Sequence, residues 1–111
     1  MDFHLTESEQ DTIRACMVAI AEGQFLENAD FQTRLGIDRR TLGAILSDPD
    51  FDYRSDDPDV NLAINNCMNE IAHGVRIPPA EWGQWFAVPL QEVKRTFLKW
   101  QESRERTSEQ P

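Results

Sequence analysis

Apolar residues recur along the chain at helical spacing, and the same pattern returns at a constant offset of 51 residues. Each occurrence follows the i, i+3, i+4, i+7 rule that places side chains on one face of an amphipathic helix. The repeated positions are Ile13, Cys16, Met17 and Ile20, then Ile64, Cys67, Met68 and Ile71. Self-similarity of this kind is typical of a duplicated supersecondary unit, and we predict copies at residues 6–46 and 57–97.

The first copy begins with residues that are typical of the N-terminus of a helix. Thr6 with Glu9 matches a capping box, in which side chains at the two positions satisfy each other's backbone N–H groups. The helix is predicted to run to about Glu22, where Gly23 is expected to end it in the left-handed conformation.

Two shorter helices are predicted to complete the first copy. Asn28 or Asp30 is expected to cap a helix that ends at Leu35. Asp38 is then expected to cap a third helix that runs to about Ser47. The unit is therefore predicted to be tri-helical.

The second copy repeats this order after an acidic linker at residues 47–57. Asp57 stands at the cap position and Pro58 suits the first helical residue, so a helix is predicted for residues 58–73. A short helix with Trp82 and a longer final helix follow.

The predicted fold is an all-α single domain over residues 1–111, with six helices in two pseudo-symmetric tri-helical repeats. The long helices 7–22 and 58–73 are expected to pair at its centre, because a unit of about 50 residues is too small for a stable core alone. The final helix is predicted to end near residue 103, and residues 104–111 are expected to fray.

Charge narrows the range of partners. The chain holds 11 Lys and Arg against 20 Asp and Glu, a formal net charge of −9. Such an excess repels phosphate backbones and anionic lipid, so nucleic acid and membrane surfaces are disfavoured. No apolar run reaches about 18 residues and no signal peptide is recognisable, which predicts a cytoplasmic protein. Cys16 and Cys67 are interpreted as core residues, and a disulfide between them would require the two helices to cross there.

Residues 30–46 resemble a helix-turn-helix: a short helix, a turn at Gly36 and a second helix with its apolar positions inward. The resemblance implies that Arg39 and Arg40, at the exposed start of the second helix, meet DNA bases. Cations on the final helix extend this candidate surface, namely Lys94, Arg95 and Lys99. Acidic neighbours, and the absence of both arginines from the second copy, weigh against DNA contact, so a DNA-binding regulator is the alternative interpretation.

Features confined to the second copy are the best candidates for a protein-binding surface. Asn65 and Asn69 form a polar stripe with Asn61, which is a buried network, a recognition surface or a solvated face. His73 follows on the same helix. Trp85 stands where the first copy has an arginine, and such a tryptophan is typical of an interface, although packing against the final helix explains it equally well.

Metal chemistry has weak support in the sequence. Glu70 and His73 have the spacing of two ligands on one helical face, but a second such pair is missing. Five linker aspartates fall in a calcium-loop frame, namely Asp48, Asp50, Asp52, Asp56 and Asp59. The frame lacks the turn glycine and the bidentate glutamate, so a plain acidic loop is favoured and no cofactor is predicted.

The residues point to binding rather than catalysis. No arrangement of serine, cysteine and histidine indicates a nucleophile, so we predict that the protein is not an enzyme. The favoured function is a protein-interaction or regulatory module, for example an adaptor, an inhibitor or an immunity-like partner of a basic protein. A DNA-binding regulator is the second interpretation, and a metal-binding protein that uses Glu70 and His73 is the third.

Overall fold

The part of the chain that the structure describes has helices as its only regular secondary structure, as predicted. The computed structural model describes residues 5–109, without the side chains of Asn28 and of residues 105–109. Six α-helices and one π-helical segment lie in this range, and it contains no strand. None of these helices is both long and apolar enough to cross a membrane.

The predicted capping box starts α1 (Glu7–Glu22). The Thr6 hydroxyl accepts the Glu9 N–H at 3.1 Å, and the Glu9 carboxylate accepts the Thr6 N–H at 2.7 Å. Gly23 ends the helix with extended backbone (φ −75°, ψ 157°), so the prediction of a left-handed residue is wrong. Glycine is needed there for space, because a side chain would overlap the Phe25 ring.

α2 (Asn28–Leu35) ends where the sequence predicts but begins without the expected cap. Its N-cap residue is Glu27, which makes no side-chain capping hydrogen bond, so the prediction of a cap at residue 28 or 30 is wrong. Asp30 instead lies in the first turn, where its charge complements the helix dipole. Gly36 then adopts the left-handed conformation (φ 76°), and Leu62 lies where a side chain at this position would go.

Aspartates cap the next two helices as predicted. α3 (Arg39–Ser47) starts at Asp38, whose carboxylate accepts a first-turn backbone N–H at 2.7 Å. Hydrogen bonds from the side chain and the backbone N–H of Thr41 lower the pKa of Asp38. α4 (Pro58–Asn69) starts at Asp57, whose carboxylate accepts a first-turn N–H at 2.8 Å.

The second long helix ends in a π-helical turn that the sequence pattern does not indicate. α4 passes directly into η1 (Glu70–Gly74), where the Val75 N–H donates to the Glu70 carbonyl at 2.7 Å. The Glu70 carboxylate is buried and receives the Arg34 guanidinium in a bidentate ion pair. A side chain at Gly74 would overlap this carboxylate, so the glycine leaves room for the ion pair.

Two further helices, α5 (Pro79–Trp85) and α6 (Leu90–Glu109), follow. Trp82 fixes the turn between them, because its indole N–H donates to the Val88 carbonyl at 2.8 Å. The Trp82 ring also stacks on Phe86, with 4.3 Å between the centroids. This short helix and its turn therefore form a rigid unit.

α6 is longer than the sequence predicts. The helix continues to Glu109, beyond the expected end near residue 103. The expected fraying of residues 104–111 stays a prediction, and residues 110–111 lie outside the described range. Arg104 anchors this last part, since its guanidinium donates to the Arg54 carbonyl at 3.1 Å and to the Asp56 carboxylate at 3.3 Å.

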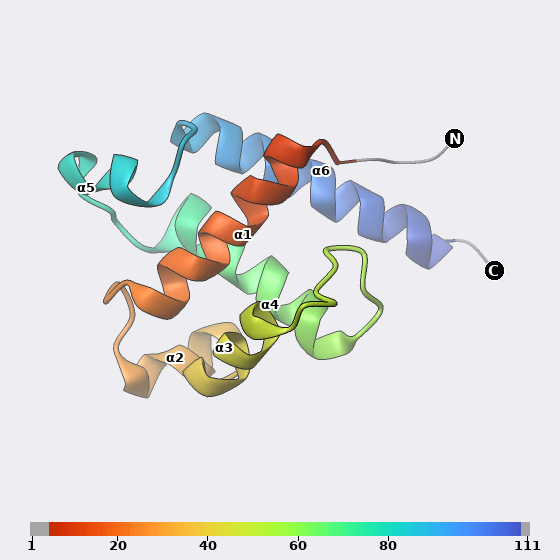
Figure 1. Cartoon of the computed structure of the whole chain (residues 1–111), viewed down its shortest axis with the longest axis horizontal. Helices are drawn as coiled ribbons and strands as arrows, with labels where there is room; N and C mark the ends of the chain where they lie inside the picture. Colours follow the sequence, from red (N-terminus) through yellow and green to blue (C-terminus); the bar gives the residue numbers. More distant parts are fainter. Residues whose placement is uncertain (1–4, 110–111) are drawn as a thin grey trace.

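α1 and α4 form the centre of the molecule, as predicted. Figure 1 shows α1 crossing in front of α4, with α6 on one side of this pair and α2 and α3 on the other, and α5 packs on α1. Cys16 and Cys67 are fully buried in this core as free thiols. Burial raises the pKa of both, that of Cys67 to about 12.

Candidate functional site

An acidic hollow opens beside the loop that joins α3 to α4. It has a volume of about 310 Å³ and is lined by five aspartates: Asp48, Asp50, Asp52, Asp57 and Asp59. The described residues that line it include no lysine or arginine. Asp52 pairs with the Arg54 guanidinium at 3.5 Å. Together the five carboxylates create a negative potential, which favours cationic groups.

Some of these aspartates also shape the loop. The Asp48 carboxylate accepts the Asp50 N–H at 2.8 Å. The Asp52 carboxylate accepts the Arg54 N–H at the same distance. Bonds of this kind are the usual way in which aspartate stabilises a turn. The side chains of Asp50 and Asp59 take no part in them, and both residues are exposed, so their charges are the ones most accessible to a partner.

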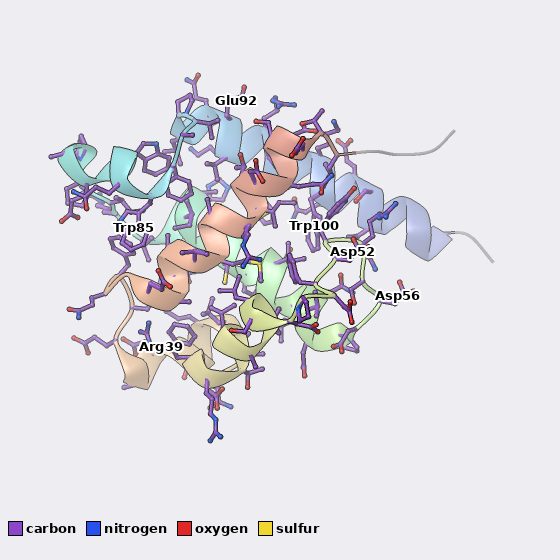
Figure 2. The ribbon with its side chains drawn as sticks, in the orientation of Figure 1. Arg39, Asp52, Asp56, Trp85, Glu92 and Trp100 are labelled. Atoms are coloured by element: carbon purple, nitrogen blue, oxygen red, sulfur yellow. The ribbon has the colours of Figure 1, made fainter. Side chains whose placement is uncertain are left out.

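α6 holds the acidic loop in place. The Trp100 indole N–H donates to the Tyr53 carbonyl at 3.2 Å, and Arg104 pairs with Asp56. Figure 2 shows Trp100, Asp52 and Asp56 close together where α6 passes this loop. Most of the residues that line the hollow belong to the loop between α3 and α4. The contacts with α6 hold the backbone of this loop in place.

A second hollow of about 540 Å³ lies between the same loop and α1. Phe51 and Asp52 line both hollows, which therefore adjoin. Charges of both signs line the second one, Asp11 and Asp52 with Arg14 and Arg54.

On the other side of α1 lies a groove of about 470 Å³, which we call the Trp85 groove. α1 lines it with Glu7, Ser8, Asp11, Thr12 and Ala15, and residues 85–88 form the opposite wall. Trp85, the predicted interface residue, is half-buried, and its ring meets the Phe25 ring edge-on with 5.9 Å between centroids. Asp11 lines both this groove and the second hollow, so the three depressions adjoin across α1.

The asparagine stripe on α4 does not act as one unit. Asn69 is exposed, whereas the half-buried Asn65 donates to the Asn66 side-chain carbonyl at 3.0 Å. The Asn61 oxygen is enclosed and has no hydrogen-bond partner in the described part of the chain. The strongest contact belongs to Asn66, which is not in the stripe: its amide donates to the Leu35 carbonyl at 2.7 Å and so caps the end of α2.

Two alanine substitutions on α4 should have opposite effects. Asn66→Ala is expected to lower the free energy of unfolding by about 1 to 2 kcal/mol, because the Leu35 carbonyl loses its donor. Asn69→Ala is expected to raise it by about 0.5 kcal/mol, because alanine favours the helix and the asparagine is exposed. Urea denaturation followed by circular dichroism measures both. Equal effects of the two substitutions would contradict this distinction.

The first predicted DNA contact, Arg39, is directed into the protein (Figure 2). Its guanidinium donates to the Ala21 carbonyl at 2.6 Å and to the Leu26 carbonyl at 3.1 Å. It also stacks over the Phe31 ring, 4.4 Å from the centroid. A positive charge at this place complements the end of α1. Arg40 is exposed on α3, and DNA contact through the two arginines stays a prediction.

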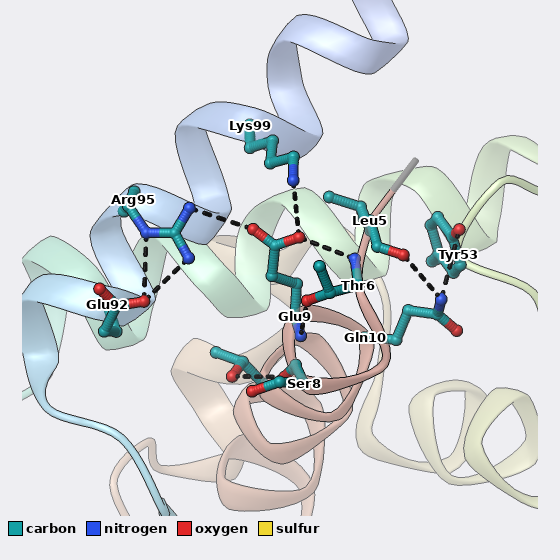
Figure 3. Close-up of polar contacts among 10 residues, drawn as sticks. Leu5, Thr6, Ser8, Glu9, Gln10, Tyr53, Glu92, Arg95 and Lys99 are labelled. Atoms are coloured by element: carbon teal, nitrogen blue, oxygen red, sulfur yellow. Dashed lines mark hydrogen bonds and ion pairs between the residues drawn. The ribbon is translucent and has the colours of Figure 1, made fainter. Parts of the chain in front are cut away.

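Two of the cations predicted on the final helix bind one buried carboxylate (Figure 3). Glu9, whose side chain is 5% exposed, accepts Lys99 at 2.7 Å and Arg95 at 3.1 Å. Burial alone would raise the pKa of Glu9, but hydrogen bonds from Lys99 and from the helix cap outweigh it and hold the pKa at about 2. Lys94 is exposed. Arg95 and Lys99 therefore connect α6 to the start of α1.

The candidate metal ligands are not brought together. Glu70 is engaged by Arg34, and His73 is exposed on η1. Among the side chains that the structure describes, no group of three or more His, Cys, Asp and Glu is placed to hold a metal ion, and this includes the linker aspartates. The geometry thus gives no support to the metal-binding interpretation.

Comparisons with known proteins find no match: no protein-family model, curated protein or solved structure is significantly similar to this chain.

Proposed function

We propose that this protein is a non-enzymatic binding module that recognises a basic segment of another protein, with the acidic hollow as the point of contact. One observation carries the proposal: five aspartates line a single hollow, and no cation is among the described residues that line it. Electrostatic complementarity of this kind speeds association and selects a basic partner. The cytoplasm is the proposed location.

The proposal is tested with two variants of equal charge change. Asp50→Asn/Asp59→Asn removes the two accessible carboxylates of the hollow, and Glu81→Gln/Glu102→Gln removes two exposed carboxylates elsewhere. Asp59 and Glu81 both lie in the first turn of a helix, so the dipole effects are matched. Each protein is immobilised and exposed to a nuclease-treated extract of the native cell.

We expect the wild type and the Glu81/Glu102 variant to capture the same proteins, released as the salt concentration rises. The Asp50/Asp59 variant should lose them. Equal losses from both variants would show a general charge effect, and unchanged capture by the Asp50/Asp59 variant would show that the hollow is not the contact. Either outcome contradicts the proposal.

For the alternative function, we predict no specific DNA binding at physiological salt. Cations would have to be segregated on one surface to overcome a net charge of −9. The measurement is a gel-shift assay with a mixed panel of duplexes. Binding that weakens steeply with salt, and that disappears in Arg39→Ala/Arg40→Ala, would favour the DNA-binding interpretation instead.

We also propose that residues 6–46 and 57–97 are copies of one ancestral unit. Cys16 and Cys67 occupy the same register and are equally buried, which supports this origin. The copies differ at the end of the first helix, because only the second continues into a π-helical turn. A crystal structure in which backbones 7–46 and 58–97 superpose by a near two-fold rotation is the expected result, and unrelated helix orders would contradict it.

A further inference from the structure

The Trp85 groove combines an apolar wall with a charged rim. Trp85 and Val88 face it from the α5 side and Ala15 from α1, so apolar surface is available inside it. Glu7 and Asp11 add carboxylates on the α1 side, and both are exposed. Among the described residues that line the groove there is no lysine or arginine.

The wall of the groove is held before any partner arrives. Trp82 donates its indole N–H to the Val88 carbonyl and stacks on Phe86, which fixes the turn after α5. The edge-on contact with Phe25 orients the Trp85 ring. A site that is already ordered loses little conformational entropy when it binds, so more of the contact energy appears as affinity.

The second hollow lies between the groove and the acidic hollow and adjoins both. Asp11 lines the groove and the second hollow, while Phe51 and Asp52 line the second hollow and the acidic hollow. Figure 2 shows Trp85 and Asp52 on opposite sides of α1. One extended segment that crosses α1 is therefore able to reach both ends of this surface.

We propose that the Trp85 groove binds an apolar side chain of the same basic partner segment, next to a lysine or arginine that pairs with Glu7 or Asp11. The inference rests on the proposed function and specifies the partner: a segment in which large apolar and basic residues are neighbours. Charge complementarity commits the site to this occupant. A second copy of the chain is a poor candidate, because two molecules with a net charge of −9 repel each other.

The test uses two synthetic probes. One is an eight-residue peptide of alternating lysine and leucine, and in the other serine replaces leucine, so that the charge is the same. Each is titrated into the full-length protein labelled with nitrogen-15, and amide and indole resonances are followed. We expect the leucine peptide to shift the Trp85 indole resonance and to bind about ten-fold more tightly than the serine peptide, which should shift only the acidic loop.

Three variants locate the effect. Trp85→Ala is expected to weaken the leucine peptide about ten-fold and to leave the serine peptide unchanged. Ala15→Gln fills the groove from α1, and glutamine is also a good helix former. This variant should weaken the leucine peptide to the same extent, while the contact between the Trp85 and Phe25 rings is kept. Leu98→Ala, which removes an exposed apolar side chain of α6, is the control and should change neither affinity.

This inference is overturned if the two peptides bind with equal affinity. It is also overturned if neither Trp85→Ala nor Ala15→Gln changes the affinity for the leucine peptide. The proposed function then survives only if binding still depends on Asp50 and Asp59. If Asp50→Asn/Asp59→Asn leaves the serine peptide unaffected, the acidic hollow itself has failed as the contact. The two failures are therefore distinguishable.

Discussion

Glu9→Gln is expected to lower the free energy of unfolding by about 3 kcal/mol at pH 7. The Glu9 carboxylate lies 2.7 Å from Lys99 and 3.1 Å from Arg95, and only 5% of its side chain is exposed. Its pKa falls from 4.5 to about 2 in the folded protein, a difference that corresponds to about this free energy. Denaturation by urea, with circular dichroism as the signal, gives the measurement.

The destabilisation caused by Glu9→Gln should become smaller as the pH falls. Because the folded state holds the pKa of Glu9 below the unfolded value, its stabilisation is complete above about pH 4.5 and disappears as the pH falls toward 2. The difference between wild type and Glu9→Gln should narrow over this window. Glu92→Gln is the control, since Glu92 also pairs with Arg95 but is about half exposed, and it should cost less than about 1 kcal/mol. A difference that does not change with pH would contradict the assigned pKa.

Arg34→Ala should also destabilise the protein by about 3 kcal/mol. The Glu70 side chain is 8% exposed, and without Arg34 its carboxylate loses a bidentate partner while it stays buried. Arg34→Ala/Glu70→Gln should be less destabilised than Arg34→Ala alone, because the amide carries no charge. Arg40→Ala, at an exposed position of α3, is the matched control. The measurement is the urea midpoint of each variant.

Gly74→Ala tests the ion pair between Arg34 and Glu70 without changing either of these residues. An added methyl group at Gly74 would overlap the Glu70 carboxylate and displace it from Arg34. The substitution should therefore destabilise, even though alanine is normally the better helix residue. A gain in stability would show that the ion pair adapts without cost.

Local signals made much of the fold predictable from the sequence. Thr6, Asp38 and Asp57 act as caps because each bonds to backbone only two or three residues away. The π-helical turn after α4 is different, because Glu70 is held by Arg34 from a distant helix. No local pattern records such a contact. The continuation of α6 likewise depends on a loop some 50 residues earlier in the chain.

The sequence predicts only part of the candidate site. The run of aspartates predicts an acidic loop, but the hollow requires α3 and α4 to approach it from both sides. Trp85 stood out because the first copy has an arginine there, whereas its contact with Phe25 is tertiary. Arg39 looked exposed by analogy with a helix-turn-helix. In the structure, the unpaired carbonyls near the end of α1 draw its guanidinium inward.

Reaction of the two buried thiols with a reagent reports on local opening of the folded structure. Cys16 lies on α1 and Cys67 on α4, both are fully enclosed, and a thiol reagent reaches them only when the structure opens. Each cysteine belongs to a different half of the sequence. Equal labelling rates at the two sites would mean that the halves open in one cooperative event, whereas unequal rates would identify the half that separates first.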